Sequence, residues 1–423
     1  MSSSGTVTDH VLYLFDGWAE RVKATVLREG GIHVHCAVNI AISGKIRHNG
    51  HIYCAVKKAK LTSMHSERAL VESVLETLRG LPQAHAELGL WEQPTGRDRG
   101  YDARIDLQIG GESVSLLIEA KRAVYPRDVR EIIWQMRRYM DHAPSERANE
   151  QRLSLIVAES ISPGAKELLR EEQVGYFDSG GSLFIPARGA YVYIEKPPPK
   201  PVAKVLRSLF SGLRTQVLHA LLVRPRTWVS IKELAEQSQA SPATVSQVMT
   251  ELERFDWLEI QGQGPSKERL LREPGALLDA WSKQLGLGRS PALRRYYVPA
   301  IKPMDLPERL DRVFEQHQAA YAITHEAAAQ RYAPFLSSVS QVRCRLMPGR
   351  PVEEALGALD ARVVTEGANL AVIEIKSSGE LLFREKVDGV WLASPVQVYL
   401  DLVRSEGRAK EMAEHLRRER IGF

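Results

Sequence analysis

Polar and apolar residues alternate along two neighbouring segments in the first half of the chain. The run Arg104–Ile109 alternates strictly. The run Val114–Lys121 alternates at its two ends, and its centre is apolar. A period of two is typical of a strand with one buried face. The intervening residues Gly110, Gly111 and Glu112 are typical of a tight turn. The pattern therefore predicts an antiparallel hairpin.

Helical periodicity flanks this hairpin, with apolar residues recurring every three to four positions over Glu67–Leu78 and Val129–Tyr139. Ser162-Pro163 marks a further helix start, because proline is favoured in the first helical turn. Short apolar runs predict three more strands, at Leu153–Ala158, Val174–Phe177 and Leu183–Ile185. The order predicts an α/β domain over residues 64–196, with a mixed sheet covered by helices, preceded by an appendage of uncertain structure over residues 1–63.

The second strand of the hairpin carries candidate chemistry. Residues two apart in a strand share a face, so Glu119 and Lys121 project to one side, and Asp106 is expected to reach that side from the paired strand. Two carboxylates make a hard oxygen site for Mg²⁺ or Mn²⁺. A lysine ammonium beside them can orient or deprotonate a water that attacks a phosphodiester. The spacing thus predicts metal ligands at Asp106 and Glu119.

These residues resemble the PD-(D/E)xK nuclease superfamily. Glu119-Ala120-Lys121 matches the (D/E)xK element and Asp106 lies where the first acid is expected, although no proline precedes it and Asp102 is an alternative. Gln135-x-x-x-Tyr139 is similar to the Gln-x-x-x-Tyr element of RecB-like and Holliday-resolvase-like members. The resemblance implies catalytic roles for Asp106, Glu119, Lys121, Gln135 and Tyr139.

The same resemblance implies one more metal ligand. In the superfamily an acid on the first helix often joins the metal site, and Glu72 or Glu76 is the candidate here. Mg²⁺ is accordingly the expected cofactor if the nuclease site is active.

A proline run at Lys196–Pro201 predicts a semi-rigid linker, assigned to residues 197–204. Beyond it the pattern predicts a helix over Val205–Leu222, and then a second over Ile231–Gln237 that begins with a capping box. A third helix is capped by Ser241 and runs to Phe255, and two short strands around a glycine-rich tip follow it. Residues 205–285 therefore predict a winged helix-turn-helix.

The third helix and the wing carry the expected DNA contacts. Val245, Val248, Met249 and Leu252 form the buried stripe of the helix. Small polar residues remain on its other faces, where they suit base edges and phosphates. The expected contacts with double-stranded DNA are Ser241, Thr244, Ser246, Gln247 and Thr250 on the helix and Lys267 and Arg269 on the wing.

The charge distribution agrees with this partner. Residues 202–300 contain 14 Lys and Arg and 9 Asp and Glu, an excess of 14 − 9 = +5 that equals the net charge of the whole chain. A locally basic module is what phosphate contact requires.

Residues 286–423 predict an α+β domain. Helices are expected at Leu306–Phe314 and from Thr324, and strands at Ala371–Ile375 and Leu381–Phe383. The phrases Gly-Ala-Asn at residues 367–369, Ser-Pro-Val-Gln-Val-Tyr-Leu-Asp-Leu at 394–402 and Gly407-Arg408 resemble AbiEi-type antitoxins of type IV toxin–antitoxin systems. That resemblance, from about residue 205 onward, implies repression through operator DNA and opposition to a nucleotidyltransferase toxin. The nuclease-like N-terminal half departs from simple antitoxins.

Composition narrows the class further. In 423 residues no apolar run approaches the length of a membrane span, and the first residues lack the apolar core of a secretory signal. Three cysteines are too few for a disulfide scaffold, so a reducing cytoplasm is expected. The spacing of the N-terminal histidines and cysteines matches no zinc pattern, so solvated side chains on strands are expected instead. These residues are His33, His35, Cys36, His48, His51 and Cys54.

The sequence therefore supports two main hypotheses. The first is a DNA-binding transcriptional regulator, antitoxin-like, in which the nuclease-like domain adds DNA binding or regulation. The alternative is a Mg²⁺-dependent DNA endonuclease that is targeted by its winged helix. A third hypothesis is a protein that neutralises a toxin through its C-terminal domain. Regulators with winged helices commonly form homodimers, but no heptad seam specifies an interface here.

Overall fold

The computed structural model describes residues 67–91, 101–142, 151–288, 291–299 and 306–423. In the N-terminal segment it describes only the backbone of four strands, β1 (His10–Phe15), β2 (Trp18–Lys23), β3 (Thr25–Val26) and β4 (Cys36–Ala37). The interpretation of the N-terminal histidines and cysteines therefore lies outside the described side chains. None of the helices described has the length and apolar character needed to cross a membrane.

The N-terminal unit is built on a seven-stranded mixed sheet with the order β11-β10-β9-β8-β7-β6-β5. The strands β7, β8 and β9 are parallel, and α2 (Pro126–His142) and α3 (Pro163–Glu171) connect them. All other pairs in the sheet are antiparallel. The strands are β5 (Ala84–Trp91), β6 (Ala103–Ile109), β7 (Glu112–Val124), β8 (Gln151–Ile161), β9 (Gly175–Asp178), β10 (Leu183–Ala187) and β11 (Ala190–Ile194).

The predicted hairpin is present as β6 and β7. Gly110 and Gly111 have φ values of 59° and 86°, the left-handed region that a two-residue hairpin turn of this kind requires. The strands leave the turn in register, with Ile109 opposite Glu112.

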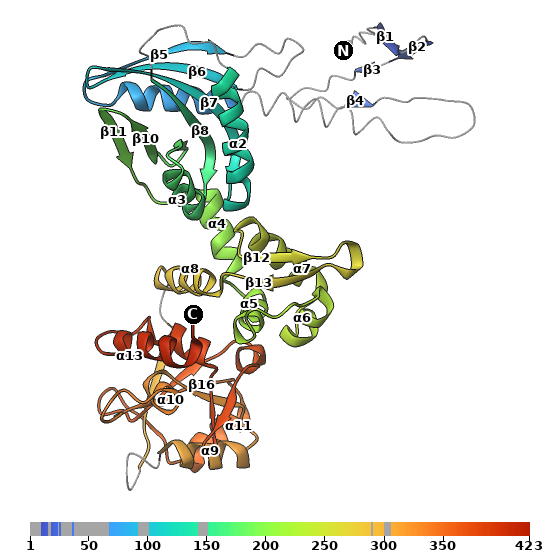
Figure 1. Ribbon diagram of the computed structural model, residues 1–423. Helices are drawn as coiled ribbons and strands as arrows, with labels where there is room; N and C mark the ends of the chain where they lie inside the picture. The colour runs from blue at the N-terminus through green and yellow to red at the C-terminus, as the bar shows by residue number, and fades with distance from the viewer. Residues whose placement is uncertain are drawn as a thin grey trace, which may run out of the picture.

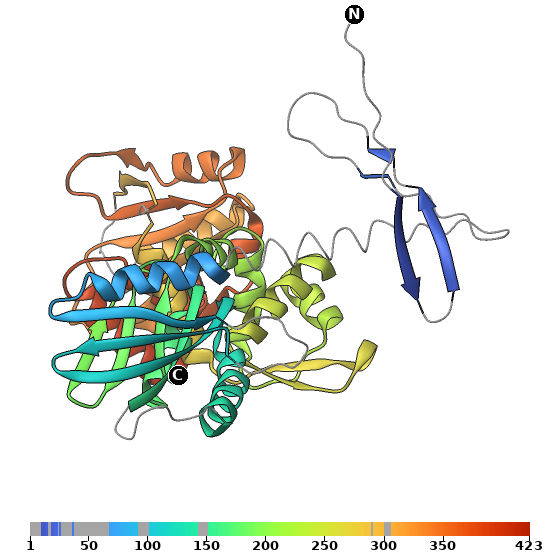
Figure 2. The same ribbon diagram turned by 90° about the horizontal axis from the view of Figure 1, so that it is seen from above.

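The two faces of this sheet are covered by different helices, as Figures 1 and 2 show. Val114, Leu116 and Ile118 pack in one core with the helix at residues 67–79. Leu117 packs in the other core with α2 and α3. Because side chains alternate along a strand, Glu119 and Lys121 lie on the α2 side.

The middle unit contains four helices, a two-stranded sheet and a fifth helix. These are α4 (Lys200–Leu209), α5 (Arg214–Val223), α6 (Ile231–Ser238), α7 (Pro242–Arg254), β12 (Leu258–Gln261), β13 (Glu268–Leu271) and α8 (Pro274–Gly286), with the 3₁₀ turn η1 (Gly264–Ser266) between the strands. The caps predicted at Ser230 and Ser241 are confirmed, including the capping box with Glu233.

Two expectations for this unit are wrong. The single helix predicted over Val205–Leu222 is broken into α4 and α5, and Gly212 in the break has a φ of 59°. The proline segment is also shorter than the predicted linker, because α4 already begins at Lys200 with Pro201 in its first turn. Proline is tolerated there since the first helical N–H groups need no partner within the helix.

The C-terminal unit is α+β, with a second seven-stranded mixed sheet in the order β17-β14-β18-β16-β15-β20-β19. Its strands are β14 (Leu293–Tyr297), β15 (Tyr321–Thr324), β16 (Val342–Leu346), β17 (Arg362–Val363), β18 (Leu370–Glu374), β19 (Glu385–Val387) and β20 (Val390–Leu392). Its helices are α9 (Leu306–Gln316), α10 (His325–Tyr332), α11 (Arg350–Ala358), α12 (Pro395–Leu402) and α13 (Ala409–Leu416), with the short turns η3 (Ser378–Leu381) and η4 (Arg417–Ile421). The strand predicted at Leu381–Phe383 is wrong, because η3 and a turn occupy that segment.

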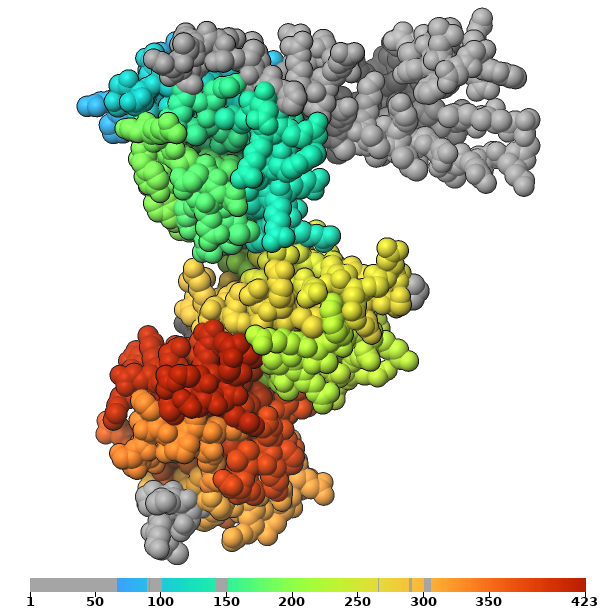
Figure 3. Space-filling model, viewed as in Figure 1, coloured from blue at the N-terminus to red at the C-terminus, as the bar shows by residue number. Residues whose placement is uncertain are grey.

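The middle and C-terminal units share one continuous apolar core. The three units are stacked one above the other in Figure 3.

His219 on α5 lies in the core that the middle and C-terminal units share. It is hydrogen-bonded to the Ser394 hydroxyl that caps α12, and the centre of its ring lies 4.8 Å from that of Phe383. Burial lowers the pKa of His219 from 6.5 to about 3. The positive charge of Arg345 lowers it further, and this effect exceeds the opposite effect of the Asp401 carboxylate.

We expect this histidine to make the protein sensitive to acid. The folded protein keeps His219 neutral, whereas the unfolded chain takes up a proton near pH 6.5, so stability falls as pH drops from 6.5 towards 3. This group contributes up to about 1.4 kcal/mol per pH unit. In urea titrations at several pH values, His219→Gln should show a flatter dependence of the unfolding free energy on pH in this interval. Parallel curves for the two proteins would refute the assignment.

Candidate nuclease-like site and nucleic-acid interface

Four of the predicted catalytic side chains converge beside the C-terminal half of β7. Glu119 is buried, and its Oε1 atom accepts hydrogen bonds from Lys121 Nζ at 2.5 Å and from Gln135 Nε2 at 3.3 Å. Gln135 is also hydrogen-bonded to the Tyr139 hydroxyl one turn further along α2. The α2 helix therefore positions the Gln135 amide against the carboxylate of the neighbouring strand and the Tyr139 phenol against that amide.

The first acid of this cluster is Asp102 and not Asp106. Ala103 lies opposite Ile118 in the β6–β7 ladder, which places Asp102 beside Glu119, and Asp102 Oδ2 accepts from the backbone N–H of Ala120 at 2.7 Å. Asp106 lies opposite Ser115, and the guanidinium of Arg104 binds its carboxylate at 3.0 and 3.1 Å. Asp106 is therefore about 13 Å along the strand from Glu119, and its predicted role at this site is wrong.

The predicted third acid does not reach the cluster either. Glu76 is exposed on the helix at residues 67–79, which packs on the opposite face of the sheet, and Glu72 on the same helix pairs with Arg68 at 3.6 Å. Among the residues that the structure describes, no group of three or more His, Cys, Asp or Glu side chains could hold a metal ion. Asp102 and Glu119 thus fit a Mg²⁺ site only in part.

The state of Lys121 limits what this cluster can do. Burial acts to lower its pKa, but the hydrogen bond to Glu119 and the charges of Glu119 and Asp102 outweigh burial and raise the pKa above its ordinary value. Lys121 is therefore an ammonium at neutral pH. It can orient or stabilise an anionic oxygen, but in this arrangement it cannot take up a proton from water.

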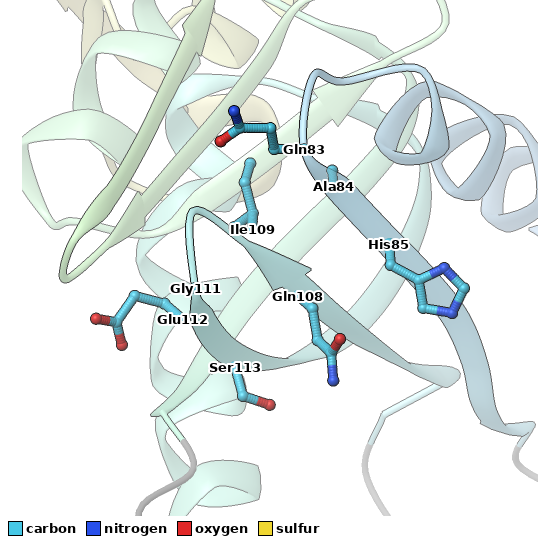
Figure 4. A pocket seen from close by; sticks show the side chains of 8 residues that line it. All are labelled: Gln83, Ala84, His85, Gln108, Ile109, Gly111, Glu112 and Ser113. Carbon is cyan, nitrogen blue, oxygen red and sulfur yellow. The ribbon is translucent and has the colours of Figure 1, made fainter.

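An open cavity of about 430 Å³ lies at the other end of the same strands. His85, Gln108 and Ser113 are cross-strand neighbours in its lining, and His85 is hydrogen-bonded to Glu87. In Figure 4 the polar ends of Gln83 and Glu112 point away from those of Gln108 and Ser113. Since no set of polar groups converges on this cavity, it is a weaker candidate than the Glu119 cluster.

The exposed face of α7 is mostly polar, with Pro242 and Ala243 exposed in its first turn. Its opposite stripe, Val245, Val248, Met249 and Leu252, is fully buried as predicted. Ser241, Gln247 and Thr250 are exposed, and Thr244 and Ser246 are half-buried. Ser241 caps the helix by accepting from the N–H of Thr244, and Thr250 donates to the carbonyl of Ser246, so part of this hydrogen-bonding capacity is used within the helix.

One cation near this face was not predicted. Arg214, at the start of α5, donates from Nη2 to Gln247 Oε1 at 2.9 Å. The break at Gly212 sets the start of α5, so the continuous helix expected from the apolar pattern concealed this position. Arg214 orients the Gln247 amide and adds a positive charge beside it.

The two residues predicted to contact DNA from the wing, Lys267 and Arg269, both bind Glu253. Glu253 Oε1 accepts from Arg269 Nε and from Lys267 Nζ, both at 3.0 Å, and Arg269 is only 6% exposed. Burial acts to raise the pKa of Glu253, but the hydrogen bonds from Lys267 and Arg269 outweigh it, so the pKa lies below its ordinary value. The prediction that Arg269 contacts phosphate is wrong, because its guanidinium is buried against a carboxylate. Lys267 keeps partial exposure but is paired with the same group.

Glu253 also joins α7 to the N-terminal unit. Arg127, in the first turn of α2, lies 3.6 Å from Glu253 Oε2. Beside this pair Tyr125 makes an edge-to-face contact with Phe255 at 5.4 Å, and the guanidinium of Arg254 lies over the Tyr125 ring. The last turn of α7 is thereby fixed against the first turn of α2.

Comparison of this chain with protein-family models, with curated proteins and with solved structures found no match.

We expect Glu253→Gln to destabilise the protein by about 3 kcal/mol, near the lower end for breaking a buried ion pair, because Arg269 would keep an uncompensated charge. The free energy of unfolding in urea measures this loss. Glu251→Gln is the matched control, since Glu251 lies on the same helix and pairs with the half-exposed Arg254. The control should cost less than about 1 kcal/mol. Equal effects of the two substitutions would contradict a structural role for Glu253.

Proposed function

We propose that this protein is a DNA-binding transcriptional regulator of the antitoxin-like kind, which reads duplex DNA with the exposed face of α7. The observation that carries the proposal is the division of this helix into a buried apolar stripe and an exposed stripe of small polar side chains. Hydroxyl and amide groups on a helix that enters the major groove can read base edges.

The surroundings of α7 support a winged helix-turn-helix as its framework. The short helix α6 precedes it across a tight connection in which Gln239 adopts a left-handed conformation, and the antiparallel pair β12–β13 follows it. This hairpin projects from the middle unit in Figure 2. Ser241, which caps α7, is exposed at the start of the helix.

The N-terminal unit is included in the proposal as a PD-(D/E)xK-like domain that contributes DNA binding or regulation. Its helix at residues 67–79, the antiparallel strands β5–β7, α2 and the parallel strand β8 follow one another in the order expected for that fold. The C-terminal unit is proposed to be the AbiEi-like domain, and Asn369 of its Gly-Ala-Asn phrase exchanges two hydrogen bonds with the backbone of Val298.

Replacement of Gln247 by alanine tests the reading by α7. On an operator selected from a random duplex library, Gln247→Ala should lose about 1–3 kcal/mol of discrimination against mismatched sites, the cost of one base contact. Gel-shift titration and footprinting measure the effect. Gln316→Ala, an exposed glutamine on α9, is the control and should behave like the unchanged protein. An unaltered footprint and affinity for Gln247→Ala would remove this side chain from the interface.

The Glu119 cluster favours a second candidate function, a Mg²⁺-dependent endonuclease, because Asp102, Glu119 and Lys121 lie together. The test is incubation of plasmid with the protein and Mg²⁺, beside Lys121→Ala. We expect intact DNA, since the third acid is not among the described neighbours of Glu119. Nicking or linearisation that disappears in the variant would establish the endonuclease instead.

A further inference from the structure

The outer face of α2 is an arginine-rich surface with an exposed tryptophan. Six residues between positions 127 and 138 are exposed, and four of them are arginines, with one glutamate and one tryptophan. Trp134 is 61% exposed, the second most exposed of the large hydrophobic side chains in this unit. These residues, which we call the α2 surface, are Arg127, Arg130, Glu131, Trp134, Arg137 and Arg138.

The side chains of the α2 surface are arranged for contact with an anion beside an aromatic ring. The guanidinium of Arg138 lies 4.8 Å from the centre of the Trp134 ring. Such stacking holds the guanidinium in one orientation on the outer face of the helix. The Trp134 ring is exposed beside these arginines, so it can contact the same ligand as they do.

The ion pairs inside the protein leave this surface positive. Arg137 pairs with Glu172 at 2.8 Å, but both groups remain largely exposed. Arg127 pairs at 3.6 Å with Glu253, which Arg269 and Lys267 already neutralise. Arg130 makes no ion pair with any residue in the described part of the chain. The surface thus has more positive charge than its neighbours compensate.

The interface proposed for α7 has less positive charge than the α2 surface. Its exposed side chains are mostly neutral, the cations near them are Arg214 and Arg254, and Glu253 holds the two cations predicted for the wing. Phosphate neutralisation supplies a large part of the affinity of most proteins for DNA. A helix that reads bases without wing cations therefore needs positive charge from another element.

We propose that the α2 surface binds the phosphate backbone of the same duplex that α7 reads. The inference rests on the proposed function, and it assigns to the N-terminal unit a role in DNA binding that requires no cleavage. The two surfaces are continuous, because the contacts of Arg127 with Glu253 and of Tyr125 with Phe255 join the first turn of α2 to the last turn of α7. In Figure 1 α2 extends from this junction along the N-terminal sheet.

The length of α2 sets the size of the additional footprint. A helix of 17 residues spans about 26 Å, which corresponds to roughly seven base pairs of duplex. The α2 surface should therefore contribute to binding of a long duplex and contribute little to a duplex of about one helical turn (~10 base pairs).

The test uses the full-length protein and random-sequence duplexes of about one and about three helical turns. The variant Arg130→Gln/Arg138→Gln should bind the long duplex more weakly. The slope of log affinity against log salt should be smaller by about 2, since each lost phosphate contact removes about 0.9. Trp134→Ala should weaken binding without changing the slope, because the ring has no charge. The two variants should match the unchanged protein on the short duplex.

Arg68→Gln is the matched control. Arg68 is 65% exposed and lies 5.5 Å over the ring of Trp91, so it repeats the arginine–tryptophan pair on the helix that covers the opposite face of the sheet. It should leave affinity and salt slope unchanged. An equal loss in this control would show a general charge effect and overturn the inference.

The remaining outcomes separate this inference from the proposed function. If the α2 variants keep the slope and affinity of the unchanged protein while Gln247→Ala loses discrimination, the α2 surface serves another partner and the inference fails alone. If the α2 variants lose affinity while Gln247→Ala has no effect, the backbone contact is supported and reading by α7 fails. No binding of either duplex by the unchanged protein at low salt overturns both.

Discussion

The ion pairs of the buried Glu253 carboxylate are the interaction on which the arrangement of α7, the β12–β13 hairpin and α2 depends. The carboxylate receives Lys267 and Arg269 from the β12–β13 hairpin and Arg127 from α2, so one side chain connects three segments that are distant in sequence. A buried charge is tolerated only when it is paired. Three cations surround the Glu253 carboxylate and compensate its charge. The edge-to-face contact of Tyr125 with Phe255 adds apolar packing at the same place. Together they fix the direction of α7 relative to the N-terminal sheet.

Under the proposed function, this cluster also determines which groups can contact DNA. Lys267 and Arg269, which hold the hairpin against α7, are paired with Glu253. The exposed side chains of α7 are suited to base edges, and Arg214 adds one charge beside Gln247. The four exposed arginines of the α2 surface lie on the other side of the Glu253 junction. In the two proposals, base reading and phosphate binding belong to different helices, which the contact of Arg127 with Glu253 joins.

Local patterns predicted much of this fold, and tertiary contacts account for the errors at Glu76 and Arg269. The two caps and the hairpin turn follow from nearby residues. Counting outward from Gly110 and Gly111 would also have paired Asp102 with Glu119, because a two-residue turn fixes the register. The position of Glu76 could not be found by counting residues. It depends on which face of the sheet its helix covers, and contacts between residues distant in sequence determine that face. Nor could local sequence show that Arg269 is buried against Glu253, because the pair forms only when the hairpin folds back on α7.

The Glu119 cluster follows the same physical logic as Glu253. Its carboxylate is bound by Lys121 and Gln135, which satisfy it without a metal, and the resulting rise in the pKa of Lys121 keeps the lysine charged. A cation ligated by Glu119 would have to displace the ammonium at a cost in electrostatic energy, unless a phosphate compensated the released charge. Lys121 lies on the α2 side of the sheet, because it alternates with Leu117 along β7, and Gln135 of α2 reaches the same carboxylate from the helix.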